Sequence, residues 1–495
     1  MSTDNRPVPM APDGHEASAV AEAAHGIEQR GIGYIPSSER HGKPSDLFWM
    51  WAGALWNIEY VVYGALIISI GLSFWQAFLI IILGNLTYFI AGLGSLQGPA
   101  AGTSVFTITR APYGPQPARG ISAFNWVTQV GYEVEGLSLI VLAGLALALK
   151  AGVSASTGLK ILIIVLAALI QLVVPLFGHK TMMRVLRLLV LPFVVLFIIL
   201  AVLALPKAHF SSAHGASWEM MMVALALIAT SGGLGWPINA SDYSRYLPKN
   251  SDRRQIVLAV TAGGYVPSVL LALLGAAVAT AVPIASDPIS GLPHAFASWF
   301  LIPYLVFIIV QLFAINSIDL YSSGLTLQAI GLKIKRWQAV LVDTVVSGAI
   351  TAVVIFSASF NTFLTDFLLF MIIWIAPWVG IFLVDYFLRR GTYDSRSLLE
   401  TRAGVYWRTA GWHIPGVVAQ LLGMVAAAMW LDTTVWQGPL SRATNGADFS
   451  IFMGTIVGGL AYYLLARRSV PREVAVDPDV EPVTARGSAK LTDLD

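Results

Sequence analysis

The stretch TQVGYEVEG at residues 128–136 places two carboxyl groups and an amide inside a long apolar segment. On a helix that turns 100° per residue, five positions of this segment share one face: Asn125, Gln129, Tyr132, Glu133 and Gly136. An ionised carboxylate at the centre of a bilayer costs at least about 2.5 kcal/mol. We therefore expect Glu133 to face a cavity, a partner or a proton. Glu135 points about a third of a turn away from this face, and its role stays open.

Two other apolar segments carry polar side chains that could line a binding site. The first contains WNIEY (56–60), with Trp56, Asn57 and Glu59. The second contains AINSIDLYSSG (314–324), in which three polar residues share a helix face: Asn316, Asp319 and Ser323. Gln129, Tyr132, Glu133 and Asn316 are the candidate site residues of these segments.

Carboxyl groups within apolar segments indicate coupling to a cation. Such groups can bind and release protons, and acids within a membrane are functional by default. We assign this role to Glu59, Glu133 and Asp319. The alternative is a buried network in which protonated carboxyls only hold helices together. Three further acids are interpreted as structural: Asp343, Asp366 and Asp385.

The stretch TSGGLGWPIN (230–239) predicts a break in a helix, because it combines glycines with a proline that removes a helix hydrogen bond. Unwound backbone within a membrane is tolerated only where protein or a water-filled cavity satisfies it. We therefore add Gly233, Gly235 and Trp236 to the candidate site residues, as substrate contacts. Trp56 and Asn57 join them, because they lie at the same depth in their own segment. The alternative for the glycines is a close-packing surface between helices.

Composition shows which elements must position these residues. Of the 495 residues, 56% are hydrophobic and only 12% are charged, which indicates an all-α integral membrane protein. Twelve apolar stretches are long enough to span a bilayer as helices. They lie at 47–72, 74–97, 120–149, 157–177, 183–205, 219–246, 255–281, 300–330, 338–357, 362–388, 414–434 and 448–466.

The positive charges predict the orientation of the chain. With a cytoplasmic N-terminus, all but four of the 30 Lys and Arg residues, so 30 − 4 = 26, fall on the cytoplasmic side or in the tails. The four exceptions are Lys150, Lys160, Lys207 and Arg442. We predict a cytoplasmic tail over 1–44, a transmembrane transporter domain over 45–470 and a disordered cytoplasmic tail over 471–495. The membrane would be the plasma membrane, with both termini on its cytoplasmic side.

The polar break positions also predict an internal repeat. The first and sixth segments open two groups of five, and both are interrupted by polar or helix-breaking residues. Interrupted segments at corresponding positions are typical of inverted-repeat transporters, whose substrate site lies near the midplane of the bilayer.

Five stretches resemble one known family. They are GLSFWQAF, ILGNLTYFIAGLGSLQGPAAGTSVFTITRAPYG, GWPINASDYSRYLPKN, NSIDLYSSGLTLQAIG and APWVGIFLVDYFLRRG. Together they resemble the nucleobase:cation symporter-1 family, the purine and cytosine permeases, from about Arg30 to Arg468. The DYSRYLPKN and VDYFLRRG blocks are the most specific.

This resemblance implies a leucine-transporter-type fold with a five-plus-five inverted repeat and two further C-terminal helices. It also implies that Gln129 and Tyr132 bind and stack on a base, and that Asn316 belongs to the same site. Sodium-coupled relatives carry two hydroxyl residues before this Asn, where the present chain has Ala314 and Ile315. Aliphatic side chains offer no ligands to Na⁺, which needs oxygen. Protons become the expected coupling cation.

We therefore expect a proton-coupled importer of a nucleobase such as cytosine or a purine, or of a related heterocycle. The alternatives are sodium-coupled nucleobase transport and a symporter of a cationic heterocycle, such as a thiamine-like vitamin or its pyrimidine precursor. No enzyme is expected, because the 8 histidines form no metal cluster and no nucleophile has a base at helical spacing. No cofactor, metal or nucleic acid is expected, and we predict a monomer in a lipid bilayer.

Overall fold

The computed structural model describes residues 31–173, 179–210, 215–281, 297–357 and 360–473. Its first five-helix group runs through the following helices: α2 (Pro44–Leu55), α3 (Ile58–Ser69), α4 (Phe74–Asn85), α5 (Tyr88–Gly94), α6 (Gln97–Ala101), α7 (Val105–Ile108), α8 (Arg110–Tyr113), α9 (Pro115–Lys150), α10 (Thr157–Gln171) and α12 (His179–Ala204). The remaining helices are α13 (Trp218–Ala229), α14 (Pro237–Ser244), α15 (Arg253–Ala281), α17 (Ser298–Ile330), α18 (Arg336–Ser357), α19 (Phe360–Leu388), α20 (Ser395–Leu399), α21 (Ile414–Trp430), α22 (Pro439–Ala443) and α23 (Ser450–Ala466).

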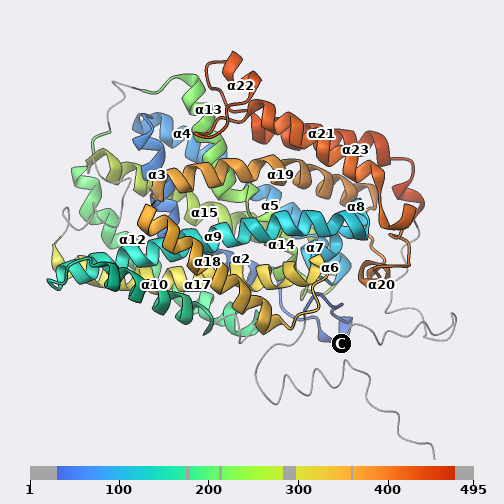
Figure 1. The fold of residues 1–495 in the computed structure, drawn as a ribbon, viewed down its shortest axis with the longest axis horizontal. Helices are drawn as coiled ribbons and strands as arrows, with labels where there is room; N and C mark the ends of the chain where they lie inside the picture. Colours follow the sequence, from blue (N-terminus) through green and yellow to red (C-terminus); the bar gives the residue numbers. More distant parts are fainter. Residues whose placement is uncertain (1–30, 174–178, 211–214, 282–296, 358–359, 474–495) are drawn as a thin grey trace, which may run out of the picture.

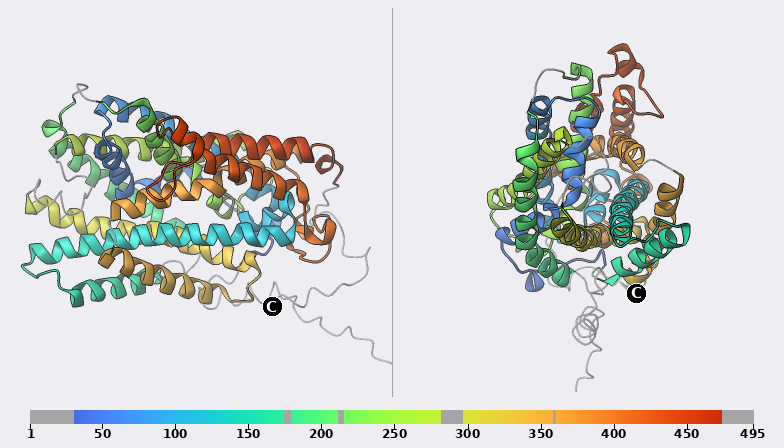
Figure 2. Two further views of the ribbon diagram at one scale, coloured as in Figure 1. Left: turned by 45° about the horizontal axis from the view of Figure 1, so that its top comes forward. Right: turned by 90° about the vertical axis from the view of Figure 1, so that its left-hand side faces the viewer.

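The long helices run along the longest axis of the molecule (Figure 1) and are seen nearly end-on in the right-hand view of Figure 2. Among the described residues, nine helices are long and apolar enough to cross a bilayer, and the bent pair α2 and α3 makes a tenth. Two shorter apolar helices, α10 and α23, lie in the fourth and twelfth predicted stretches, so the described helices are consistent with twelve spans. The predicted class, an all-α integral membrane protein, is confirmed.

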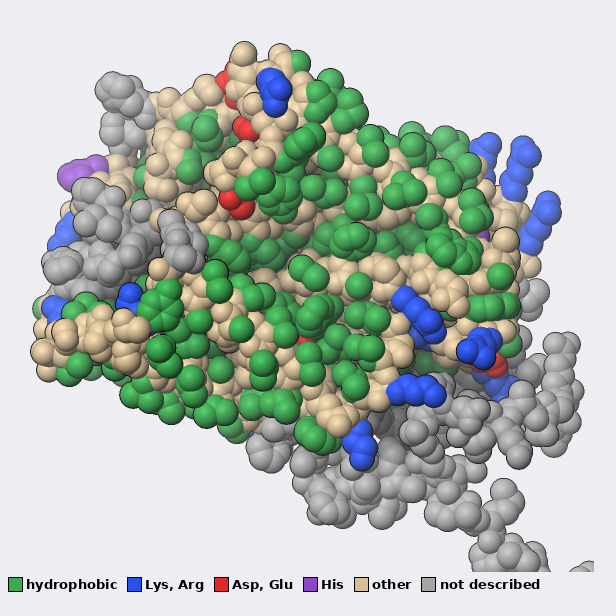
Figure 3. All heavy atoms as spheres, viewed as in Figure 1, with side chains coloured by type: hydrophobic (Ala, Val, Ile, Leu, Met, Phe, Trp, Pro, Cys, Tyr) green, Lys and Arg blue, Asp and Glu red, His purple; other side chains and the backbone are tan. Residues whose placement is uncertain are grey.

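The outer surface is apolar, as a lipid bilayer requires. Hydrophobic side chains cover most of the lateral face in Figure 3, and Lys and Arg gather mostly toward its right-hand end, where α8 and α20 lie in Figure 1. Large apolar side chains point outward, such as Leu191 of α12 at 71% exposure and Val345 of α18 at 63%. An apolar belt of this kind would be unstable against water, but it matches lipid.

The packing of the helices follows the predicted repeat. Numbering the spans in chain order, the seventh span (α15) packs against the first (α2 and α3), and the sixth (α13) packs against the second (α4). In a repeat of five spans, the first span corresponds to the sixth and the second to the seventh, so these two contacts are equivalent. The third span (α9) corresponds to the eighth (α17), and these two pack against each other. α21 and α23 pack together against α19. This is the five-plus-five arrangement with two additional helices.

Glycines permit the closest of these contacts. A Cβ on Gly64 of α3 would lie 1.9 Å from the carbonyl oxygen of Ala272 in α15, and a Cβ on Gly275 of α15 would lie 2.0 Å from that of Val61 in α3. The two backbones therefore touch, which only small residues allow. The first span is held firmly against the seventh.

Candidate functional site

The sixth span is broken where the sequence predicted it. α13 ends at Ala229, the chain makes a wide turn over Thr230–Leu234, and Gly232 takes the non-helical angles φ −88° and ψ −139°. Pro237 then opens α14. The hydroxyl of Tyr60 in α3 donates to the carbonyl oxygen of Ser231 at 3.3 Å and satisfies one freed backbone group. The break therefore lies against the first span.

The first span is broken as well, with a bend of 58° between α2 and α3. Asn57 has extended backbone angles, and its Oδ1 accepts a hydrogen bond from the backbone N–H of Glu59 at 2.6 Å. Its Nδ2 donates to Glu59 Oε2 at 3.0 Å. Asn57 thus caps α3, a role that asparagine favours because its side chain replaces the missing backbone acceptor. Trp56 precedes it and is only half-buried.

An aromatic pair joins α9 to the broken sixth span. The rings of Tyr132 and Trp236 are stacked, with centroids 6.3 Å apart and planes 14° apart. Phe367 of α19 meets Tyr132 edge-on at 5.2 Å, and Trp236 Nε1 donates to the Tyr60 hydroxyl at 3.2 Å. Two residues expected to hold a planar substrate therefore lie together, in direct contact with each other.

An amide pair runs beside the aromatic pair. Gln129 lies one turn before Tyr132 on α9, and Asn239 lies three residues after Trp236. Gln129 Nε2 donates to Asn239 Oδ1, while Gln129 Oε1 is buried without a hydrogen-bond partner among the described residues. An unpaired buried acceptor is costly, and a substrate donor would satisfy it.

Asn316 lies on α17 and has other partners. Its Nδ2 donates to the carbonyl oxygen of Glu133 at 3.3 Å and to Gln171 Oε1 of α10 at 3.2 Å. A Cβ on Gly136 would lie 2.0 Å from Asn316 Oδ1, so the glycine makes room for this amide. Among the described residues Asn316 Oδ1 also lacks a partner. Asn316 thus reaches α9 through Gly136 and Glu133, and Gln129 has a separate partner in Asn239.

The two glycines of the break have different neighbours. A Cβ on Gly233 would lie 1.9 Å from the backbone nitrogen of Tyr88, so Gly233 packs against α5, as the close-packing alternative expected. A Cβ on Gly235 would lie 2.5 Å from the Tyr132 hydroxyl. Gly235 is therefore the glycine that faces the aromatic pair.

The three acids assigned to cation coupling are buried, but they lie in different surroundings. Glu59 is 7% exposed and bound to Asn57. Glu133 is 0% exposed, and neither of its carboxyl oxygens has a hydrogen-bond partner among the described residues. Asp319 of α17 is buried with Oδ1 equally unpaired. Glu133 and Asp319 are thus buried acids with unpaired oxygens, which need a cavity, a partner or a proton.

Ala314 and Ile315 occupy the buried face of α17 before Asn316. The carbonyl oxygen of Ala314 accepts a hydrogen bond from Ser317 Oγ at 2.6 Å. Both backbone oxygens that could replace the absent side-chain ligands lie inside α17, where they accept intrahelical hydrogen bonds, and that of Ala314 has this second donor as well.

Several residues of this region were not singled out from the sequence. Tyr63 donates to Glu135 Oε1 at 2.7 Å, which places Glu135 against the first span. The hydroxyls of Tyr60 and Tyr88 lie 2.5 Å apart, and Ser268 donates to Tyr88 at 3.0 Å. The spacing of Tyr60 and Tyr63 next to Glu59 is a signal that the sequence contained, because residues three apart share a helix face.

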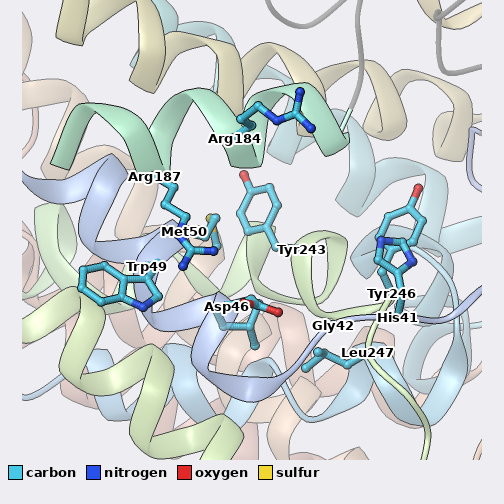
Figure 4. Close-up of a pocket in the computed structure, with 11 residues that line it drawn as sticks. His41, Gly42, Asp46, Trp49, Met50, Arg184, Arg187, Tyr243, Tyr246 and Leu247 are labelled. Atoms are coloured by element: carbon cyan, nitrogen blue, oxygen red, sulfur yellow. The ribbon is translucent and has the colours of Figure 1, made fainter.

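A pocket of about 320 Å³ opens at the end of the molecule where α2 begins. Its lining includes Trp49 and Met50 of α2, Arg187 of α12, and Tyr243 of α14, all shown in Figure 4, where Arg187 points toward Trp49. Rings connect it to the site: Tyr243 meets Trp51 edge-on at 5.8 Å, and Trp51 meets Trp236 edge-on at 5.3 Å. Two aromatic rings therefore separate this pocket from the aromatic pair.

Comparison with known proteins gives one consistent family. Residues 34–454 match the family model described as permease for cytosine/purines, uracil, thiamine, allantoin. The putative purine-cytosine permease YxlA of Bacillus subtilis is 28% identical over 460 residues, covering 89% of this chain and 96% of that protein. The purine-cytosine permease fcyB of Emericella nidulans is 25% identical over 474 residues, covering 89% and 88%.

Solved structures support the fold. Mhp1, a nucleobase-cation-symport-1 family transporter in a closed conformation with bromovinylhydantoin bound, superposes with a TM-score of 0.71. The match has 17% identity and covers 89% of this chain and 95% of that one. The inward-facing conformation of Mhp1 matches with a TM-score of 0.66 at 16% identity, covering 89% and 96%.

Proposed function

Because this chain belongs to the family of permeases for cytosine and purines, uracil, thiamine and allantoin, we propose that it imports a nucleobase or a nucleobase-like heterocycle together with a proton. The family consists of transporters, not enzymes, and the chain is a multi-pass membrane protein. The observation that carries the substrate class is the pairing of stacked rings, Tyr132 and Trp236, with the free acceptor of Gln129 at a broken span.

Each part of this site has a physical task. Aromatic faces stack on any planar base, so Tyr132 and Trp236 supply affinity without choosing the base. An amide offers one acceptor and two donors, so Gln129 and its neighbour Asn239 can match donors and acceptors along a ring edge. The rings are in contact in this conformation, so substrate must part them or bind at their edge. Release then proceeds past Trp51 and Tyr243 into the pocket of Figure 4.

Proton coupling is part of the proposal. Ala314 and Ile315 provide no side-chain oxygen for Na⁺, whereas Glu59, Glu133 and Asp319 provide buried carboxyls. We further propose a plasma-membrane location with both termini in the cytoplasm, and a monomeric transporter. The decisive experiment is uptake of labelled purines and pyrimidines into proteoliposomes under an imposed pH gradient. Uptake of none of these compounds would contradict the substrate class.

The second candidate is a symporter of a cationic heterocycle. It is favoured by the unpaired carboxyl of Glu133, which could pair with a positively charged ring. Competition by a panel of purines, pyrimidines and cationic heterocycles separates the two. If Gln129→Leu binds as tightly as wild type and Glu133→Gln alone abolishes binding, the cationic substrate replaces the nucleobase.

A further inference from the structure

The buried face of α18 is polar. Four of its side chains are at most 4% exposed: Asp343, Thr344, Ser347 and Thr351. Three of them have an oxygen with no hydrogen-bond partner among the described residues, namely Asp343 Oδ2, Thr344 Oγ1 and Thr351 Oγ1. A helix that only separated lipid from the bundle would need no polar stripe, and buried polar groups without partners cost free energy. This stripe therefore points to a bound species.

Asp343 is held between α9 and α17. The indole Nε1 of Trp126 donates to Asp343 Oδ1 at 2.5 Å. The hydroxyl of Ser323 in α17 faces the same carboxyl. Ser323 is fully buried, and its hydroxyl has no hydrogen-bond partner among the described residues. Asp343 is thus oriented by an indole, and it keeps one free oxygen.

Glu133 belongs to the same cluster. It lies seven residues after Trp126, two turns along the same face of α9. Its carboxyl faces Ser347 of α18 and interacts electrostatically with Asp343 and Asp319. Tyr132 is adjacent in sequence, but its side chain points about 100° away around the helix, toward Trp236. The carboxyl of Glu133 is therefore directed to α18.

The charged groups around this cluster do not neutralise it. α17 contributes Asp319, a third acid. On α10, Lys160 lies over the ring of Phe356 at 5.4 Å, near the far end of α18, and on α19 Asp366 is bound to Thr434. Within the described part of the chain, no ion pair includes Glu133, Asp343 or Asp319.

We propose that Glu133 and Asp343 form one proton-binding pair between α9 and α18, lined by the hydroxyls of Ser323 and Ser347 and separate from the aromatic pair. Two neighbouring carboxyls without a cation cannot both be ionised in a low-dielectric interior, so they titrate as a unit. With two protons the pair is neutral. It then releases one proton to water, keeps the other and carries one negative charge. The inference rests on the proposed proton coupling and adds Asp343 to it.

Transport measurements test the pair. Asp343→Asn should lower pH-driven concentrative uptake relative to substrate counterflow by at least about fivefold, because coupling free energies of 1–3 kcal/mol are typical. Asp343→Glu restores a titratable group and should recover part of that ratio. Asp366→Asn neutralises an acid outside the cluster and is the matched control, with a wild-type ratio. A wild-type ratio in Asp343→Asn would overturn the proposal.

An infrared titration of the purified protein gives a second readout that needs no substrate. Between about pH 5 and pH 9, the band of protonated carboxyls should lose the same component in Asp343→Asn and in Glu133→Gln, because coupled groups share their titration. Separate, additive losses would overturn the pair. A band that responds to Na⁺ at constant pH would assign the pair to sodium instead. If the wild-type protein takes up no nucleobase, that result contradicts the proposed function and leaves the proton-binding pair to the infrared titration.

Discussion

At the scale of single residues, Gln129 and Asn239 bridge α9 and α14 one turn from the point where Tyr132 and Trp236 bridge the same two segments. The centroid separation of 6.3 Å lies within the range of rings in direct contact, about 4.5 to 7 Å. No planar ring fits between them without movement. The amide oxygen of Gln129 lies beside them and has no hydrogen-bond partner among the described residues.

Gln129→Leu is expected to weaken substrate binding about five- to a hundredfold. The change leaves a polar substrate edge and the oxygen of Asn239 unpaired in a buried site, which costs about 1–3 kcal/mol. Competition against a labelled base in proteoliposomes measures the effect. Gln420→Leu removes a buried amide of α21 that contacts Tyr113 and Trp374, and it should leave affinity unchanged. Equal losses in both variants would assign the effect to folding.

The hydroxyl and the ring of Tyr132 are expected to differ in importance. The hydroxyl has no hydrogen-bond partner among the described residues, so Tyr132→Phe should change affinity little. Tyr132→Ala removes the stacking surface, worth about 1–3 kcal/mol per base, and should weaken all planar substrates by a similar factor. Dissociation constants for a purine and a pyrimidine, measured in wild type and in both variants, separate the role of the hydroxyl from that of the ring. Selective loss of one base in Tyr132→Ala would contradict a role limited to stacking.

At the scale of the elements, the broken sixth span is fixed on one side and faces the site on the other. Gly233 meets the backbone of α5, whereas Gly235 meets the hydroxyl of Tyr132 and the carbonyl oxygen of Thr230. A backbone neighbour cannot move aside as a side chain can. The same glycine-rich stretch therefore contains a packing residue and a site residue.

Gly233→Ala is expected to lower the stability and yield of the protein, because its Cβ would lie 1.9 Å from the backbone of Tyr88. Gly235→Ala should lower affinity as well as stability, since its Cβ would lie 2.5 Å from both the Tyr132 hydroxyl and the carbonyl oxygen of Thr230. Thermal stability in detergent and uptake normalised to protein amount separate the two effects. Normal stability of Gly233→Ala would mean that α5 and the break are not packed as described.

At the scale of the whole molecule, cross-packing of the two repeats lets the first and sixth spans break at the same level. The seventh span holds the first through Gly64 and Gly275, and the second holds the sixth through Gly233. α9 contacts the sixth span through Tyr132 and the first span through Glu135, and α18 packs against α9. The proposed substrate contacts and the proposed proton-binding pair thus lie on adjacent sides of one helix.

Transport by the whole molecule is expected to follow a pH gradient and to persist without sodium, because the position before Asn316 lacks side-chain oxygens. Replacing Na⁺ with choline at constant pH in proteoliposomes should leave initial uptake rates unchanged. Collapsing the pH gradient should abolish accumulation. Uptake that disappears in choline would show sodium coupling and contradict the assignment of protons.

The sequence by itself determined the class of the molecule, the positions of its membrane segments and the two breaks. These are local properties: apolar length, and the effect of glycine, proline and polar residues on a helix. The sequence also placed Gln129, Tyr132 and Glu133 on one broad face of α9. It placed Trp236 at the break and linked the chain to its family.

Only the tertiary structure decided which residues meet. It directs Gln129 to Asn239, Asn316 to Gln171, and Glu133 to the polar face of α18. It also assigns Gly233 to packing and brings Asp343, read from the sequence as structural, into electrostatic interaction with Glu133. Periodicity gives the direction of a side chain around its own helix. The side chain that it meets can belong to a segment more than two hundred residues away, and the packing of whole helices sets that contact.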